Sequence, residues 1–241
     1  MYFENHNRLV AKPHTIYTEF GVYDLLNRPG LVIQHRDPVS KSSGSRYRIM
    51  DSNGEVLAWI IHLPSLFGRG DAIKAQIVNK HGDVVLVITQ PLSWRSSQLK
   101  VFLPGYCSVR GDILRQIGTV DLVGHVANRN YQLSSRDFQN ERIVKFGDIY
   151  AYPRAVDFPL YQNQNQTVMG SVDIKWTGLD KSKFGRFPIY NVRFHNEDEK
   201  FPAKDLDFNQ RAVLLASAIS IDFNYLSRIE VVKKKTKMGD I

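Results

Sequence analysis

The sequence predicts a mainly β domain, a closed antiparallel β-barrel around one buried C-terminal α-helix. Two observations predict it. Short alternating apolar runs separated by Gly/Asn/Asp turns recur as hairpins between Tyr47 and Trp176, a pattern typical of all-β domains. A single Ala- and Leu-rich stretch follows near the C-terminus and is apolar on nearly every side. A helix of that kind has to be buried all round, by protein or by lipid.

The first two hairpins follow the same outline. Their turns are Asp-Ser-Asn-Gly at 51–54 and Asn-Lys-His-Gly at 79–82, and each turn precedes an acidic residue and a valine. Glycine at the end of such a turn supplies the positive φ that closes a tight hairpin. We therefore predict strands at 47–50, 55–61, 75–78 and 83–89.

Two further hairpins are predicted downstream. One joins 131–134 to 141–146 through a polar turn, and the other joins 158–161 to 167–176. Four similar hairpins in one chain indicate a meander that closes on itself, because closure removes the exposed edges of a large open sheet. A plain sandwich of two sheets is the alternative that this pattern leaves open.

The C-terminal helix is predicted to begin near Asp205 or Asp207, either of which can cap its first turn. Its apolar part, Ala212–Ile221, is much shorter than the roughly 18 apolar residues expected of a membrane span. The inside of a β-barrel therefore fits it better than a bilayer does. The residues expected in this buried helix are Val213, Leu214, Leu215, Ala218, Ile219 and Asp222.

Asp222 is unusual because it directly follows the apolar stretch. A buried carboxylate has to be paired or hydrogen-bonded. One interpretation is a polar step on a lipid or ion path. The other, which we favour, is a structural carboxylate at the barrel mouth, bonded to backbone amides or to an arginine such as Arg228.

The charge balance favours anionic partners. Lys and Arg outnumber Asp and Glu by 32 to 24, for a net charge of +8, which suits phosphate backbones or acidic lipid headgroups. Four lysines gather just past the helix. Separately, Trp94, which follows Pro91, is a candidate aromatic at a membrane interface. The candidate contacts to anionic lipid or nucleic acid are Lys233, Lys234, Lys235 and Lys237, and a solvated tail is the alternative interpretation.

The sequence carries no sign of covalent catalysis. Cys107 is the only cysteine, and Gly-x-Ser-x-Gly, P-loop and His-Glu-x-x-His motifs are absent. The seven histidines are scattered without a pair at metal-ligand spacing. We therefore predict no catalytic residue, no metal ligand and no cofactor.

Five segments between Leu25 and Arg228 form an ordered set of motifs. They are 25–36 (LLNRPGLVIQHR), 91–97 (PLSWRSS), 117–120 (IGTV), 170–178 (GSVDIKWTG) and 211–228 (RAVLLASAISIDFNYLSR). In this order they resemble the motifs of phospholipid scramblases, and in particular of their fungal-type mitochondrial branch, and together they span most of the chain.

The resemblance implies a twelve-stranded barrel around a central helix, related to the tubby C-terminal domain. It also implies lipid handling at an intracellular, mitochondrial membrane, with phospholipid or an anionic membrane surface as partner. The alternative is a non-enzymatic scaffold, a scramblase-like barrel docked in a larger protein or RNA–protein assembly, because fold alone does not fix function. The expected organisation is an N-terminal extension at 1–24, the barrel domain at 25–230 and a basic tail at 231–241.

The chain departs from the family at its proposed calcium loop. The corresponding segment, 179–187 (LDKSKFGRF), has one acid among three cations. Calcium prefers six to eight oxygen ligands, including carboxylates. We therefore expect no useful calcium site here.

The cysteine cluster that anchors many animal members through palmitate has no counterpart either, since Cys107 stands alone.

Overall fold

The computed structural model describes residues 19–35, 45–62, 71–91, 98–107, 111–123, 129–137, 139, 141–151, 156–162, 167–176, 188–195 and 205–222. Within these residues the chain forms twelve strands and two α-helices. The strands are β1 (Gly30–His35), β2 (Ser45–Met50), β3 (Val56–His62), β4 (Asp71–Asn79), β5 (Val84–Pro91), β6 (Gln98–Cys107), β7 (Gly111–Val123), β8 (Arg129–Arg136), β9 (Ile143–Ala151), β10 (Asp157–Gln162), β11 (Val168–Trp176) and β12 (Pro188–Arg193), and the helices are α1 (Glu19–Leu26) and α2 (Phe208–Ile221).

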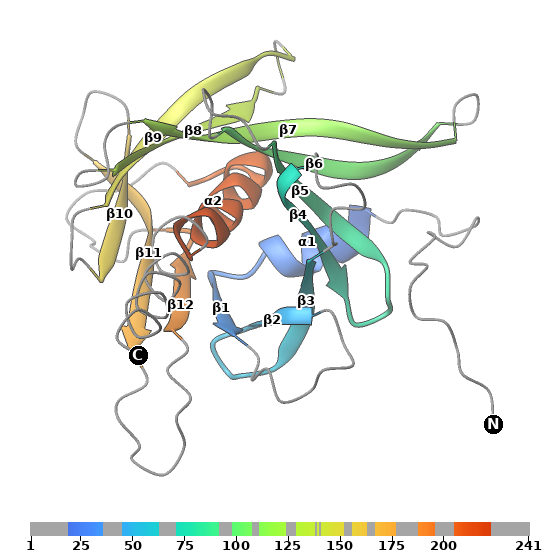
Figure 1. Cartoon of the computed structure of the whole chain (residues 1–241), viewed down its shortest axis with the longest axis horizontal. Coiled ribbons are helices and arrows are strands. Elements are labelled where there is room, and N and C mark those ends of the chain that lie inside the picture. Colours follow the sequence, from blue (N-terminus) through green and yellow to red (C-terminus); the bar gives the residue numbers. More distant parts are fainter. Residues whose placement is uncertain are drawn as a thin grey trace, which may run out of the picture.

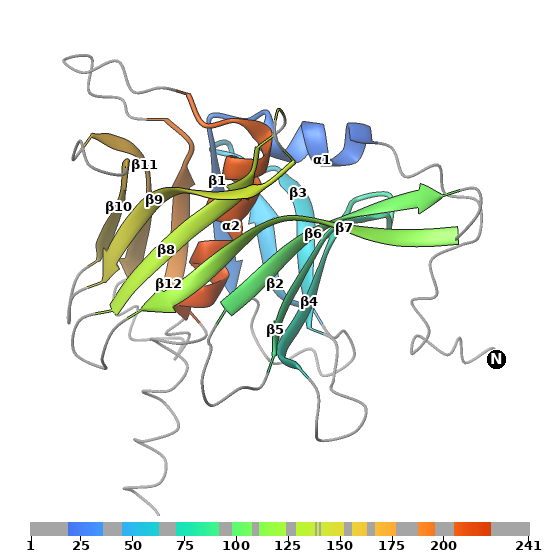
Figure 2. The ribbon, with the colours of Figure 1, turned by 90° about the horizontal axis from the view of Figure 1, so that it is seen from above.

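The strands form one closed antiparallel barrel (Figures 1 and 2). Each strand pairs with its neighbours in sequence, and β12 pairs with β1 to close the ring, from Gly30 opposite Arg193 to Gln34 opposite Ile189. The predicted closed meander is confirmed, and so is the strand number that the resemblance implies. The alternative of a sandwich is wrong, because the β1–β12 ladder leaves no break between two sheets.

The two predicted glycine turns have matching geometry. Gly54 and Gly82 have φ angles of 84° and 88°. In the first turn Asp51 Oδ1 accepts the N–H groups of Asn53 and Glu55, both at 2.9 Å. In the second, Asn79 Oδ1 accepts the corresponding two N–H groups, also at 2.9 Å. The repeated outline in the sequence therefore marks the same hydrogen-bonded turn twice.

Several elements were not predicted from periodicity. These are β1, β6, β12 and the helix α1, and for β7 only 117–120 was implied by the family resemblance. The domain boundary predicted at residue 25 cuts through α1. Val22, Leu25 and Leu26 of this helix belong to the buried core, so the domain extends at least to the start of α1.

Helix α2 lies inside the ring of strands (Figures 1 and 2). Of the two predicted caps, Asp207 is the one used: its carboxylate accepts the N–H of Gln210 at 2.9 Å, and the Gln210 side chain accepts the N–H of Asp207 at 3.0 Å. All residues from Ala212 to Ile221 are buried. The helix is about 21 Å long at ~1.5 Å per residue, and no helix in the described part of the chain has the length and apolar character needed to cross a bilayer.

Two glycines of the family-like segments lie where α2 approaches the sheet. A Cβ on Gly118 would be 2.3 Å from Val213 Cγ2 and 2.5 Å from the backbone oxygen of Ser134. A Cβ on Gly170 would be 2.6 Å from the backbone oxygen of Arg193. These positions need glycine because the helix and the neighbouring backbone leave no room for a side chain.

We expect Gly118→Ala to lower the free energy of unfolding by about 2–3 kcal/mol, as overpacking of a filled core does. Part of the clash is with backbone, which cannot rotate away. The matched control is Gly105→Ala, where the nearest atom to an added Cβ is the flexible side chain of Ile113 at 3.3 Å. Urea unfolding of both variants tests this, and equal stabilities would contradict the close approach of α2 to β7.

Arg211 ties α1 to the start of α2. Its Nη1 donates to the backbone oxygen of Leu26 at 3.0 Å, its Nε donates to the backbone oxygen of Leu206 at 2.9 Å, and its guanidinium lies over the ring of Phe194. Tyr23 of α1 packs on Phe208 of α2, with ring centroids 4.6 Å apart. Helix α1 is thereby held at one end of the barrel.

Candidate functional site

The lumen of the barrel is a packed core. The side chains of Val213, Leu214 and Leu215 are fully buried, and Ala218 and Ile219 are buried as well. They pack against apolar residues that the strands direct inward, such as Ile117 and Leu133. The predicted core positions of α2 all lie where the sequence places them. The lumen is therefore filled by side chains.

Asp222 is 5% exposed at the C-terminal end of α2. Its two carboxylate oxygens accept hydrogen bonds from the hydroxyl groups of Tyr47 and Tyr190. Burial, and next the negative charge of Asp222, raise the pKa of Tyr190 far above its ordinary value, so this hydroxyl stays protonated and keeps donating. The two tyrosines belong to β2 and β12, the strands on either side of β1.

This arrangement gives Asp222 two partners that the sequence did not predict. The sequence favoured backbone amides or an arginine such as Arg228, which lies outside the described residues. The structure instead pairs the carboxylate with two tyrosine hydroxyls that come from distant strands. Both oxygens are engaged, so Asp222 anchors the end of the helix to the strands that close the barrel.

A second acidic group lies on the outer face of β10, β11 and β12. Asp173 pairs with Arg193 at 2.5 Å and is opposite Asp157 in the β10–β11 register. Burial, and next the neighbouring Asp157 carboxyl, raise the pKa of Asp173 from 3.8 to about 6, although Arg193 opposes the rise. The folded protein therefore binds the carboxyl proton of Asp173 more tightly than the unfolded chain does.

We expect Asp173 to make the protein less stable as the pH rises from about 4 to about 6, because the folded state binds more protons than the unfolded state in that window. Asp173→Asn should remove this pH dependence. The variant should be more stable than the wild type at about pH 7.5 and equal to it at about pH 4. Urea unfolding at both pH values tests this, and a variant less stable at the higher pH would show that the ion pair with Arg193 outweighs burial.

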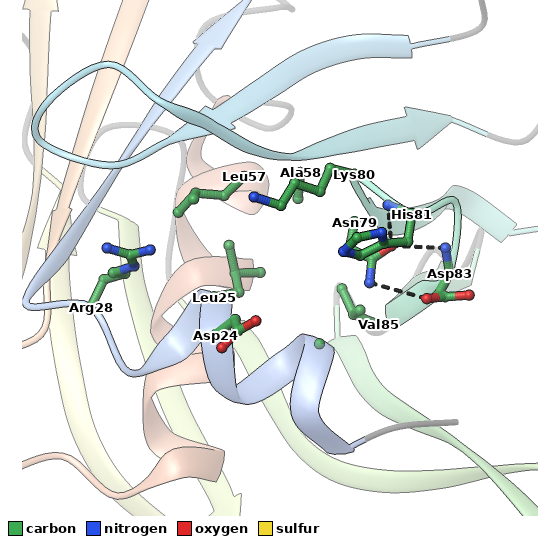
Figure 3. Close-up of a pocket in the computed structure, with 11 residues that line it drawn as sticks. Asp24, Leu25, Arg28, Leu57, Ala58, Asn79, Lys80, His81, Asp83 and Val85 are labelled. Carbon is green, nitrogen blue, oxygen red and sulfur yellow. Dashed lines mark hydrogen bonds between the residues drawn. The ribbon is translucent and has the colours of Figure 1, made fainter. Parts of the chain in front are cut away.

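A pocket of about 230 Å³ lies between α1, β3 and the β4–β5 turn (Figure 3). Its apolar lining comes from Leu25, Leu57, Ala58 and Val85. Its ionisable lining residues come from two parts of the chain. Asp24 and Arg28 are supplied by α1 and the residues after it, and Lys80, His81 and Asp83 are supplied by the β4–β5 turn.

The walls of the pocket are held by short-range contacts. Asn79 is buried, accepts two backbone N–H groups of the turn, and donates to Asp83 Oδ2 at 3.3 Å. A Cβ on Gly21 would be 2.8 Å from Asn79 Nδ2, so glycine lets α1 lie directly against the turn. The pocket is therefore formed by the fold itself.

The two basic side chains of the pocket are exposed and loosely paired. Arg28 Nη1 is 3.9 Å from Asp51 Oδ2, and Lys80 Nζ is 3.4 Å from Glu55 Oε1, with side-chain exposures of 43% for Arg28 and 55% for Lys80. Exposed ion pairs of this kind contribute about 0–1 kcal/mol. Both cations can therefore turn to a ligand at little cost.

The structure does not test the other predicted sites. Lys233, Lys234, Lys235 and Lys237 lie outside the described residues, and so do Trp94 and the segment 180–187 that corresponds to the family's calcium loop. Among the residues that are described, no group of three or more His, Cys, Asp or Glu side chains is placed to hold a metal ion.

Sequence reasoning missed the pocket. Its lining residues span 21 to 85 and come from α1, β3, β4, β5 and the residues between them, and α1 was not predicted. The sequence feature nearest to the pocket was the predicted turn at 79–82. In this turn Lys80 and His81 stand between Asn79 and Gly82, the residues that fix its geometry.

Comparison with known proteins gives consistent results. The family model described as Scramblase matches residues 43–228. "Altered inheritance rate of mitochondria protein 25" of Saccharomyces cerevisiae is 29% identical over 260 residues, covering 93% of this chain and 77% of that protein. A phospholipid scramblase family protein of Schizosaccharomyces pombe is 28% identical over 214 residues, covering 77% of this chain and 55% of that protein.

Among solved structures, an X-ray structure of an Arabidopsis thaliana protein is similar to the chain. The TM-score is 0.43 at 13% identity, covering 81% of this chain and 93% of the other. The closed barrel is established by the pairing of its own strands.

Proposed function

The chain belongs to the scramblase family, and we propose that it binds phospholipid and takes part in moving it between membrane leaflets without covalent chemistry. The observation that carries this proposal is the family match at 43–228, which extends from the start of β2 past the end of α2. One relative is named as a phospholipid scramblase family protein. We place the activity at a mitochondrial membrane because the other relative is named for the inheritance of mitochondria.

The packed lumen supports lipid contact at the outside of the barrel. Helix α2 occupies the interior, so a lipid headgroup cannot pass along the barrel axis without expelling the core. The net charge of +8 favours an anionic leaflet. We propose that Lys233, Lys234, Lys235 and Lys237 contact such a leaflet, each adding about 1 kcal/mol near the surface, and that Trp94 lies at the membrane interface.

Flotation of the full chain with vesicles tests lipid binding. We expect it to float with vesicles that contain anionic lipid and to float less as salt is raised, because salt screens surface charge. Changing the four lysines of the tail to glutamine should weaken flotation, and neutral vesicles of the same size are the control.

Transbilayer movement is measured separately, with fluorescent lipid in reconstituted vesicles and dithionite added outside. We expect the protected inner-leaflet fluorescence to fall in vesicles that contain the protein and not in empty ones. A chain that binds no vesicle and instead purifies with a stable protein or RNA partner would overturn the proposed function.

A further inference from the structure

The pocket between α1 and the β4–β5 turn has room for a small polar group. Its volume of about 230 Å³ is below the roughly 300–1,000 Å³ of sites for drug-sized ligands. A pair of acyl chains does not fit, whereas a headgroup can enter while its lipid chains stay outside. The apolar lining residues, such as Leu25 and Val85, suit the carbon atoms of such a group.

The charges of the pocket are balanced. Arg28 and Lys80 supply two positive charges, and Asp24 and Asp83 supply two negative ones. In Figure 3 Arg28 and Asp83 lie at opposite ends, with Lys80 above Leu25 and Asp24 below it. A ligand of one sign would meet two side chains of its own sign, which costs binding free energy. A zwitterion, with its charges a few atoms apart, can pair with both kinds.

The lining also discriminates between ammonium groups. Quaternary ammonium groups, as in choline, are recognised by aromatic side chains, and no Phe, Tyr or Trp is among the described residues that line the pocket. A primary ammonium has three N–H donors, and the exposed carboxylate of Asp24 offers an acceptor for them. The phosphate diester of the same headgroup would accept hydrogen bonds from Arg28 and Lys80.

We propose that this pocket binds a phosphoethanolamine headgroup, with the phosphate held by Arg28 and Lys80 and the primary ammonium held by Asp24. The inference rests on the proposed function and deepens it, because it names the class of headgroup that a phospholipid-handling protein would bind. The same chemistry is present in a membrane lipid and in the soluble headgroup. The two sources are therefore tested separately.

The first test titrates the full chain with glycerophosphoethanolamine and follows its amide NMR signals. We expect saturable shifts at α1 and the β4–β5 turn, and affinity for glycerophosphocholine about tenfold lower, because the choline group cannot donate to the carboxylate of Asp24. Lys80→Gln and Asp24→Asn should each weaken binding about tenfold, the usual effect of losing a charged hydrogen bond. Inorganic phosphate should compete poorly.

Matched controls are Lys74→Gln, an exposed lysine on β4 outside the pocket, and Asp205→Asn, an exposed carboxylate before α2. Both should bind as the wild type does, and all four variants should melt at the wild-type temperature. Equal affinity for the two headgroups, competition by phosphate alone, or no effect of Lys80→Gln and Asp24→Asn would overturn the inference.

The second test replaces phosphatidylcholine by phosphatidylethanolamine in vesicles of constant anionic content. We expect stronger flotation with phosphatidylethanolamine, and loss of this preference in Lys80→Gln. If every vesicle binds equally, the inference fails and the proposed function stands. If the soluble headgroup binds but no vesicle does, the pocket stands as a phosphoethanolamine site and the proposed function fails.

Discussion

Replacing Leu215 by arginine should abolish the folded state. Leu215 is fully buried in the lumen, on a helix that is enclosed by strands. An unpaired guanidinium there costs several kcal/mol in lost hydration, and the lost burial of leucine adds about 2–5 kcal/mol. Together these effects are comparable to the roughly 5–15 kcal/mol by which a domain is stable.

Near-UV circular dichroism and thermal unfolding measure this effect. The matched control is Leu114→Arg, because Leu114 is 53% exposed on β7 and should tolerate the same change within about 0.5 kcal/mol. Leu215→Met conserves volume and should cost less than about 1.5 kcal/mol. A Leu215→Arg protein that stays soluble and melts cooperatively while losing only lipid binding would show that α2 contacts membrane.

The hairpins were predictable because their signals are local. Gly54 and Gly82 adopt the positive φ expected of them, and the side chains that fix both turns are within four residues of their partners. The N-cap at Asp207 is local in the same sense. Closure was inferred from the number of hairpins, and the β1–β12 ladder supplies it.

The missed elements contain residues that disfavour their own structure. Pro104 and Gly105 lie within β6, and both residue types weaken a strand prediction. The hairpin of β6 and β7 extends beyond the rest of the barrel (Figure 2), so Ile113, Leu114 and Arg115 are exposed in succession and show no alternation. In α1, Gly21 lowers helix propensity yet is needed for close contact with Asn79.

The partners of the candidate sites could not be predicted because they depend on tertiary structure. Asp222 was singled out from the sequence, but Tyr47 is 175 positions away from it and Tyr190 is 32 positions away. No local pattern connects them. The same holds for the pocket, because α1 and the β4–β5 turn are far apart in the sequence and are neighbours in the folded barrel.

Replacing Asp222 by alanine should cost about 3–5 kcal/mol, because it leaves the buried hydroxyls of Tyr47 and Tyr190 without their acceptor, at about 1–3 kcal/mol each. Tyr190→Phe alone should cost about 1.5–3 kcal/mol, the range for a hydrogen bond to a charged group. Tyr150→Phe is the matched control, since Tyr150 is 40% exposed and should change stability by less than about 0.5 kcal/mol.

A double-mutant cycle isolates the contact between Asp222 and Tyr190. With Tyr190 already changed to phenylalanine, Asp222→Ala leaves one hydroxyl fewer unpaired and should cost about 1–3 kcal/mol less than it does in the wild type. Urea unfolding of the two single variants and the double variant gives this coupling. Additive effects would mean that the carboxylate of Asp222 and the hydroxyl of Tyr190 do not interact.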